Sequence, residues 1–108
     1  MGTRFLAVDL GKFYFNQGHY HFEKSNYSDA TNSLRISYQI DPTLFTQIDQ
    51  LFITQATKLT TQGRLTKTYE ILMDALSISP LFPQVTTKLD SFTLSAAIKR
   101  VKEEKGRF

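Results

Sequence analysis

Two prolines, Pro42 and Pro80, each close a segment with the same helical pattern, and this pairing limits the fold more than any other feature of the sequence. The second segment, residues 63–80, reads GRLTKTYEILMDALSISP and opens on a glycine. Its apolar residues recur three or four positions apart, at Leu65, Tyr69, Leu72 and Leu76. That spacing places them on one stripe of an α-helix. Proline then ends the helix, because it has no backbone N–H to donate.

The first segment, residues 26–42, reads NYSDATNSLRISYQIDP and carries the same pattern earlier in the chain. We call the separation in sequence between Pro42 and Pro80 the repeat offset. The same offset matches residue classes in the parts of the chain that precede each segment. The matched pairs are Leu6/Leu44, Leu10/Ile48, Phe13/Leu51, Tyr14/Phe52 and Gly18/Ala56. A pattern that returns at a fixed period is typical of stacked structural units, so the sequence predicts two copies of one helical unit.

We expect five helices, over about residues 4–24, 27–40, 42–62, 65–78 and 83–105. Asn26 is a candidate cap for the second helix, and Asp41 for the third, with Pro42 at the first helical position. The threonine-rich stretch 51–61 also fits a strand, because β-branched residues lower helix propensity. Its place in the register set by the repeat offset favours a helix.

These residue classes resemble the tetratricopeptide repeat, a family of stacked helical hairpins. The second half of that repeat has a turn glycine, then large and small residues in a fixed order, then a proline. The matching residues are Gly63, Leu65, Thr68, Leu72, Ala75, Leu76 and Pro80, and in the first copy Tyr27, Ala30, Leu34, Ser37, Tyr38 and Pro42. The first halves of the two copies fit the family less well, because Gln17 and Gln55 stand where leucine is usual and both leading helices are longer by one turn. The period is 38 residues against the family's usual length of about 34, and Ser25 replaces the turn glycine.

The resemblance implies an all-α fold in a single domain over residues 1–108. Two stacked antiparallel helical hairpins would form repeat one, about 4–42, and repeat two, about 43–80, with a C-terminal capping helix over about 83–105. Stacked hairpins of this family form an α-solenoid, a right-handed superhelix whose first helices line an inner groove. Stacking is physically required, because one hairpin cannot bury its own apolar stripe.

The groove face implied by this resemblance holds the candidate partner-binding residues. They are Lys12, Phe15, Asn16, His19 and Phe22 on the first helix, and Gln50, Ile53, Thr54 and Thr57 on the third. Phe15, His19 and Phe22 share one helical stripe, which fits an apolar, lightly basic trough for a peptide or a partner helix. The same stripe also fits two core phenylalanines. Some family members clamp a C-terminal carboxylate with lysine and asparagine side chains, and Phe15, His19 and Thr54 do not match that clamp.

The residue types give little support for a catalytic site or a metal-binding site. The chain has no cysteine, which excludes disulfides and thiolate metal sites. His19 and His21 are two residues apart, so a helix directs them to nearly opposite sides. No nucleophile with a base, no pair of catalytic carboxylates and no glycine-rich phosphate loop is evident. We therefore expect a non-enzymatic protein without a cofactor or a metal.

The net charge of +3 is unevenly distributed. Residues 1–54 contain four basic and five acidic residues, whereas residues 55–108 contain nine basic and five acidic ones. The excess gathers toward the C-terminus, at Lys88, Lys99, Arg100, Lys102, Lys105 and Arg107. Cations stabilise the C-terminal end of a helix, which is the favoured interpretation of this cluster. Binding of nucleic acid by the same cations is the less favoured alternative. Glu103 and Glu104, within the same stretch, argue against nucleic acid as a partner.

The function expected from these observations is that of an adaptor or scaffold that binds another protein, as a peptide or a helix, in the groove. The alternative is a self-associating assembly module or a fragment of a longer repeat array, because unpaired repeat ends tend to associate. No apolar run approaches the roughly 18 residues of a membrane span, so we expect no membrane insertion. The apolar run 5–8 is too short for a signal peptide, and the cytoplasm is the default expectation for the compartment.

Overall fold

The computed structural model describes residues 2–93, and all regular elements in that range are helical. The elements are α1 (Gly2–Glu23), α2 (Tyr27–Ile40), the 3₁₀ turn η1 (Pro42–Leu44), α3 (Phe45–Thr61) and α4 (Leu65–Ile78), followed by a helix over residues 83–93. The predicted all-α class is confirmed, and α4 has its predicted bounds. The part of the predicted last helix beyond residue 93 lies outside the described residues.

The threonine-rich stretch is helical within α3, so the alternative of a strand over residues 51–61 is wrong. Three threonine hydroxyls donate to backbone carbonyls four residues earlier: Thr54 to Gln50 at 2.9 Å, Thr60 to Ala56 at 2.8 Å and Thr61 to Thr57 at 3.0 Å. These bonds satisfy the hydroxyls within the helix itself. The hydroxyl of Thr60 also lies 3.3 Å from that of Thr68 in α4.

Of the two predicted caps, only one is formed by a side chain. Asp41 accepts a hydrogen bond from the backbone N–H of Thr43 at 3.1 Å, with Pro42 next to it as expected. The first turn after this cap is the 3₁₀ turn η1, and α3 begins only at Phe45. Asn26 occupies the N-cap position of α2 as predicted, but its side chain makes no capping hydrogen bond.

The two hairpin turns have the same geometry, at positions one repeat offset apart. Ser25 and Gly63 both have positive φ, 62° and 75°. The next backbone N–H reaches back five residues in each turn, from Asn26 to His21 at 2.8 Å and from Arg64 to Leu59 at 2.9 Å. This is the Schellman arrangement of a helix C-terminus. The backbone of the two turns is therefore consistent with the repeat predicted from residue classes.

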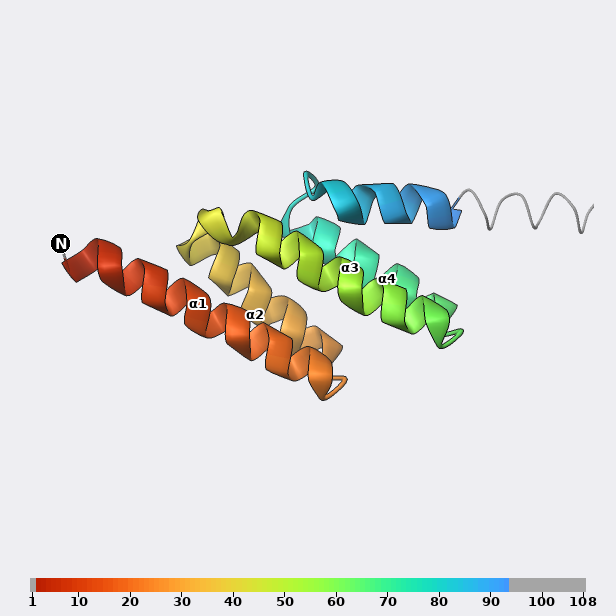
Figure 1. The fold of residues 1–108 in the computed structure, drawn as a ribbon, viewed down its shortest axis with the longest axis horizontal. Helices are drawn as coiled ribbons and strands as arrows, with labels where there is room; N and C mark the ends of the chain where they lie inside the picture. The colour runs from red at the N-terminus through yellow and green to blue at the C-terminus, as the bar shows by residue number, and fades with distance from the viewer. Residues whose placement is uncertain (1, 94–108) are drawn as a thin grey trace, which may run out of the picture.

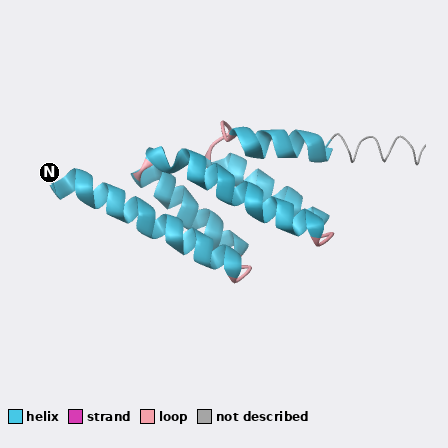
Figure 2. Ribbon diagram, viewed as in Figure 1, coloured by secondary structure: helices cyan, strands magenta, loops and turns pink. Residues whose placement is uncertain are grey.

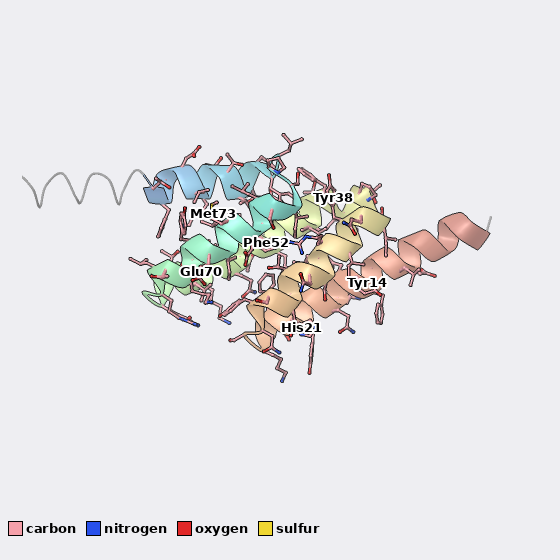
Figure 3. The ribbon with its side chains drawn as sticks, turned by 180° about the vertical axis from the view of Figure 1, so that it is seen from behind. Tyr14, His21, Tyr38, Phe52, Glu70 and Met73 are labelled. Carbon is pink, nitrogen blue, oxygen red and sulfur yellow. The ribbon has the colours of Figure 1, made fainter. Side chains whose placement is uncertain are left out.

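The helices lie in two layers. In Figure 1, α1 and α3 are in front of α2 and α4, and Figure 3 shows α2 and α4 nearest the viewer from behind. The two Schellman turns lie at one end of the molecule, and the connections that contain Pro42 and Pro80 lie at the other (Figure 2). The helix over residues 83–93 lies beside α3, on the side away from α1 (Figure 1).

Aromatic rings join the two hairpins in one core. Phe52 of α3, labelled near the centre of Figure 3, is fully buried and meets Phe22 of α1 edge-on, with ring centroids 5.4 Å apart. At the other end, Phe82 is also fully buried and stacks on Phe45 at 4.8 Å. Tyr38 of α2 lies 6.2 Å from the ring of Phe82. The core therefore continues from α1 to the last described helix.

A buried carboxylate anchors the helix over residues 83–93. Asp49 of α3 is 1% exposed, and its two oxygens accept the backbone N–H groups of Gln84 at 3.2 Å and Val85 at 3.1 Å. These N–H groups belong to the first turn of that helix and have no partner within it. The negative charge also favours the positive end of the helix dipole. Asp49 thus acts as a cap supplied by a neighbouring helix.

Candidate binding groove

The candidate groove residues occupy equivalent positions of α1 and α3. The repeat offset relates Lys12 to Gln50, Phe15 to Ile53, Asn16 to Thr54 and His19 to Thr57. Both helices lie in the front layer of Figure 1, so the eight side chains come from two neighbouring helices of one layer. The structure therefore brings these two sets to one layer of the fold.

The exposure of these side chains separates an apolar floor from a polar rim. Phe15 and Ile53 are partly buried and pack against the core. The remaining members of the eight are exposed: Lys12, Asn16, His19, Gln50, Thr54 and Thr57. Such a surface offers two apolar side chains among hydrogen-bonding groups.

Phe22 does not belong to this surface. It is 2% exposed, and its ring lies against Phe52 and, with centroids 6.3 Å apart, against Tyr27. The expectation that Phe22 lines an open trough was wrong, and the alternative of a core residue is correct for this position. The reason is its place in the last turn of α1, where the start of α2 and the side of α3 both cover it.

The hollow nearest to these residues lies between α3 and the helix over residues 83–93. Its volume is about 430 Å³, and it is lined by Ile53, Pro83, Gln84, Thr87, Lys88 and Ser91. At its edge the side-chain amides of Gln84 and Gln50 are hydrogen-bonded at 2.9 Å. Of the predicted residues, Ile53 is a wall of this hollow and Gln50 borders it. The side chains of α1 do not line it.

Sequence reasoning missed the contribution of the last described helix, although a signal for it was present. A second step of the repeat offset relates Gln50 to Lys88 and Ile53 to Ser91, and both resulting residues line the hollow. The groove residues predicted from the sequence all belong to the first and third helices. Of the cations gathered toward the C-terminus, Lys88 is in the described range, whereas Lys99 and those after it lie outside it.

Two polar side chains of the groove face make contacts within their own helices. The amide of Gln50 donates to the hydroxyl of Thr54 at 3.3 Å, and Nδ1 of His19 lies 3.4 Å from a carboxylate oxygen of Glu23. Both His19 and Glu23 are more than half exposed, so a charged pair between them would contribute little to stability. These contacts are compatible with side chains that rearrange around a ligand.

One carboxyl group with a shifted pKa lies outside the groove, on α4. Burial is the main cause that raises the pKa of Asp74, and the Glu70 carboxylate adds to it. The cations Lys67 and Arg35 oppose this effect. Asp74 thus prefers its protonated form more than a solvated aspartate does, and α4 belongs to the layer opposite the groove (Figure 3).

Within residues 2–93, no group of three or more histidine and acidic side chains is arranged to hold a metal ion. In the same range, no helix is both long and apolar enough to cross a membrane. Comparison with family models, curated proteins and solved structures gave no match to this chain.

Proposed function

We propose that this protein is a non-enzymatic interaction module of the tetratricopeptide type, which binds a peptide or a helix of another protein. The ligand lies across the face formed by α1, α3 and the helix over residues 83–93. In this proposal the hairpins form a short, right-handed α-solenoid. The last helix then corresponds to the first helix of a third unit and covers the end of the core.

The repeat geometry supports this proposal. The bounds of α2 and α4 differ by the repeat offset at both ends, and so do the last residues of α1 and α3. The connections to the following helix also correspond, because Asp41 and Ser79 each accept a bond from the N–H two residues later, at 3.1 and 3.2 Å. Two copies of one unit in one register are typical of stacked-repeat binding proteins.

The observation that carries the proposal is the hollow of about 430 Å³ next to Ile53. It combines an apolar wall at Ile53 and Pro83 with hydrogen-bonding side chains and one cation, Lys88. Helix and peptide ligands place apolar anchors in such grooves and leave polar groups at the rim. The hollow is shallow and open, which suits a ligand that lies along the surface.

Selection from a random peptide display library tests this function. Peptides enriched on the wild-type chain should lose at least tenfold in affinity for Ile53→Asp. They should bind unchanged to Ile36→Asp, which replaces a 38% exposed isoleucine of α2, outside the groove. Circular dichroism checks that both variants remain helical. Equal binding of enriched peptides to both variants would place their site elsewhere.

Self-association is a second candidate function, favoured by the exposed apolar residues at the two ends of the stack. Leu10 and Phe13 of α1 are 48% and 52% exposed, whereas their counterparts in α3, Ile48 and Leu51, are buried. On α4, Tyr69 and Met73 are 45% and 43% exposed. Unpaired repeat ends of this kind tend to associate.

Light scattering at two protein concentrations separates these possibilities. A mass that rises with concentration, and falls to that of a monomer in the double variant Phe13→Asp and Met73→Asp, would establish self-association. A monomeric mass at both concentrations would exclude it. Binding of nucleic acid by the basic C-terminal stretch would instead appear as retention on DNA or RNA that weakens steeply with salt.

A further inference from the structure

A second, smaller hollow lies at the end of the molecule where the two Schellman turns meet. Both turns contribute to its walls: Ser25 and Tyr27 from the first, Gln62 and Arg64 from the second. The remaining lining residues are Phe22, Gln55, Lys58 and Leu59. Its volume is about 70 Å³, well above the roughly 10–15 Å³ that one water molecule needs. The site is separate from the groove near Ile53.

The lining of this turn-end hollow is cationic. Its eight residues include two cations, Lys58 and Arg64, and no acidic residue. Over residues 2–93, neither of the two forms an ion pair with a carboxylate. A third cation, Lys67, is close by but already pairs with Glu70 at 2.8 Å. A small, polar hollow with two uncompensated cations favours an anionic ligand.

The guanidinium of Arg64 is held in place before any ligand binds. One of its terminal nitrogens donates to the hydroxyl of Tyr27 at 3.2 Å, and its carbon lies 5.8 Å from the centre of the same ring. Tyr27 thereby joins the first hairpin to the second at this point. A guanidinium with a fixed plane keeps its other N–H groups for an oxyanion, and loses little entropy on binding.

The nearby start of α4 adds to this preference for an anion. Arg64 occupies the N-cap position of α4, and no side chain caps this helix. The first turn contains no acidic residue, so nothing there offsets the positive end of the helix dipole. A basic residue at this position is unfavourable unless a negative group binds next to it.

We propose that the turn-end hollow binds a small oxyanion of the phosphoryl class, through Arg64 and Lys58. Arg64 supplies paired N–H donors and Lys58 supplies a point charge, as arginine and lysine usually do at phosphate groups. Gln55 and Gln62 add neutral donors at the rim. The phosphoryl group is either free phosphate or part of a phosphorylated peptide.

Titration of the full chain with inorganic phosphate, followed by amide NMR shifts, tests the site. The shifts should concentrate on the backbone of residues 25–27 and 62–66, and the dissociation constant should rise at least tenfold in Lys58→Gln. Arg64→Gln should have a similar effect, and Arg64→Lys a smaller one. Lys24→Gln, a matched loss of one exposed lysine near the same end, should leave the constant within twofold.

Chloride at the same ionic strength should fail to produce the pattern, which separates binding from general screening. A phosphoserine peptide in place of phosphate identifies the source: tighter binding of the peptide indicates a phosphorylated partner, and equal binding indicates free phosphate. The proposal is overturned if phosphate causes no localised shift, or if Lys58→Gln binds as well as wild type. Lys58 is exposed, and its ammonium group has no hydrogen-bond partner among the described residues, so this variant should fold normally.

Discussion

Ser25 adopts a strained backbone conformation that its counterpart in the second turn, Gly63, adopts without strain. It adopts φ of 62° at the first Schellman turn, whereas glycine occupies the equivalent place in the second, with φ of 75° at Gly63. A side chain in this left-handed region crowds its own backbone, at a cost of roughly 1–2 kcal/mol. The turn forms nonetheless, because the residues on both sides are held by the packing of α1 on α2.

Ser25→Gly should stabilise the protein by about 0.5–1 kcal/mol, which is less than the full strain because glycine also increases the entropy of the unfolded chain. Gly63→Ser should destabilise it by a similar amount. Urea unfolding measures both, and equal stabilities for wild type and Ser25→Gly would contradict this explanation of the turn.

Gly18 allows close contact between the first two helices. A Cβ atom at this position would lie 2.6 Å from Cγ and 2.7 Å from Cδ2 of Leu34, whose side chain is fully buried and cannot move aside. Gly18→Ala should therefore destabilise by about 1–3 kcal/mol, although alanine normally improves a helix by about 1 kcal/mol. A gain in the urea midpoint would show that the two helices can separate without cost.

The raised pKa of Asp74 makes the free energy of unfolding depend on pH. Because burial and Glu70 raise its pKa in the folded state, its contribution to stability is largest below the ordinary value of 3.8 and is lost as the pH rises through the raised value. Asp74→Asn should thus be more stable than wild type at neutral pH, and the difference should shrink in acid. The exposed Asp90→Asn is the control, and a constant difference at all pH values would contradict the prediction.

At the scale of elements, the last described helix depends on a residue of another helix. Asp49 is buried in α3 and accepts the N–H groups of Gln84 and Val85, which no side chain of their own helix satisfies. The sequence alone gave no sign of this role, since an aspartate in mid-helix is normally solvated. Only the packing of residues 83–93 on α3 brings the two partners together.

Asp49→Ala should lower the free energy of unfolding by about 1–3 kcal/mol, because it leaves the buried N–H of Val85 and the partly buried N–H of Gln84 without acceptors. Amide hydrogen exchange should speed up over residues 83–93 more than over α2 or α4. Asp90→Ala, which removes an exposed aspartate from that helix, serves as the matched control. Uniform exchange changes across the chain would mean that Asp49 supports the whole core and not this one helix.

The sequence predicted the elements well because their boundaries are local. Proline, glycine and apolar spacing determine where α2 and α4 begin and end, and these signals need no knowledge of neighbours. The site was predicted less well, because burial is decided by tertiary contacts. Phe15 and Phe22 share one stripe of α1, yet only Phe22 is covered by rings of two other helices. The hollow near Ile53 likewise requires a helix that the groove prediction had left out.

At the scale of the whole molecule, aromatic contacts make the hairpins interdependent. Phe52 meets Phe22 of the first hairpin and lies 6.4 Å from Phe82 of the last connection. Removal of this ring would leave a cavity that both hairpins share. The two units should therefore unfold together and not one at a time.

Phe52→Ala should lower the free energy of unfolding by about 3–5 kcal/mol. Far-UV circular dichroism and tyrosine fluorescence should still report one common transition, at a lower urea concentration. Leu81→Ala removes an apolar side chain that is 77% exposed and should change stability by less than about 0.5 kcal/mol. Two separate transitions in wild type would show that the hairpins fold independently.

The two Schellman turns also determine which changes in chain length the fold tolerates. Because the backbone returns to the same conformation one repeat offset later, at Ser25 and again at Gly63, a tandem duplication of residues 26–63 would restart the chain where it left off. It would add copies of α2 and α3 and leave the existing junctions intact. Duplications one residue longer or shorter would add or remove a residue of the new turn and so disrupt its Schellman geometry.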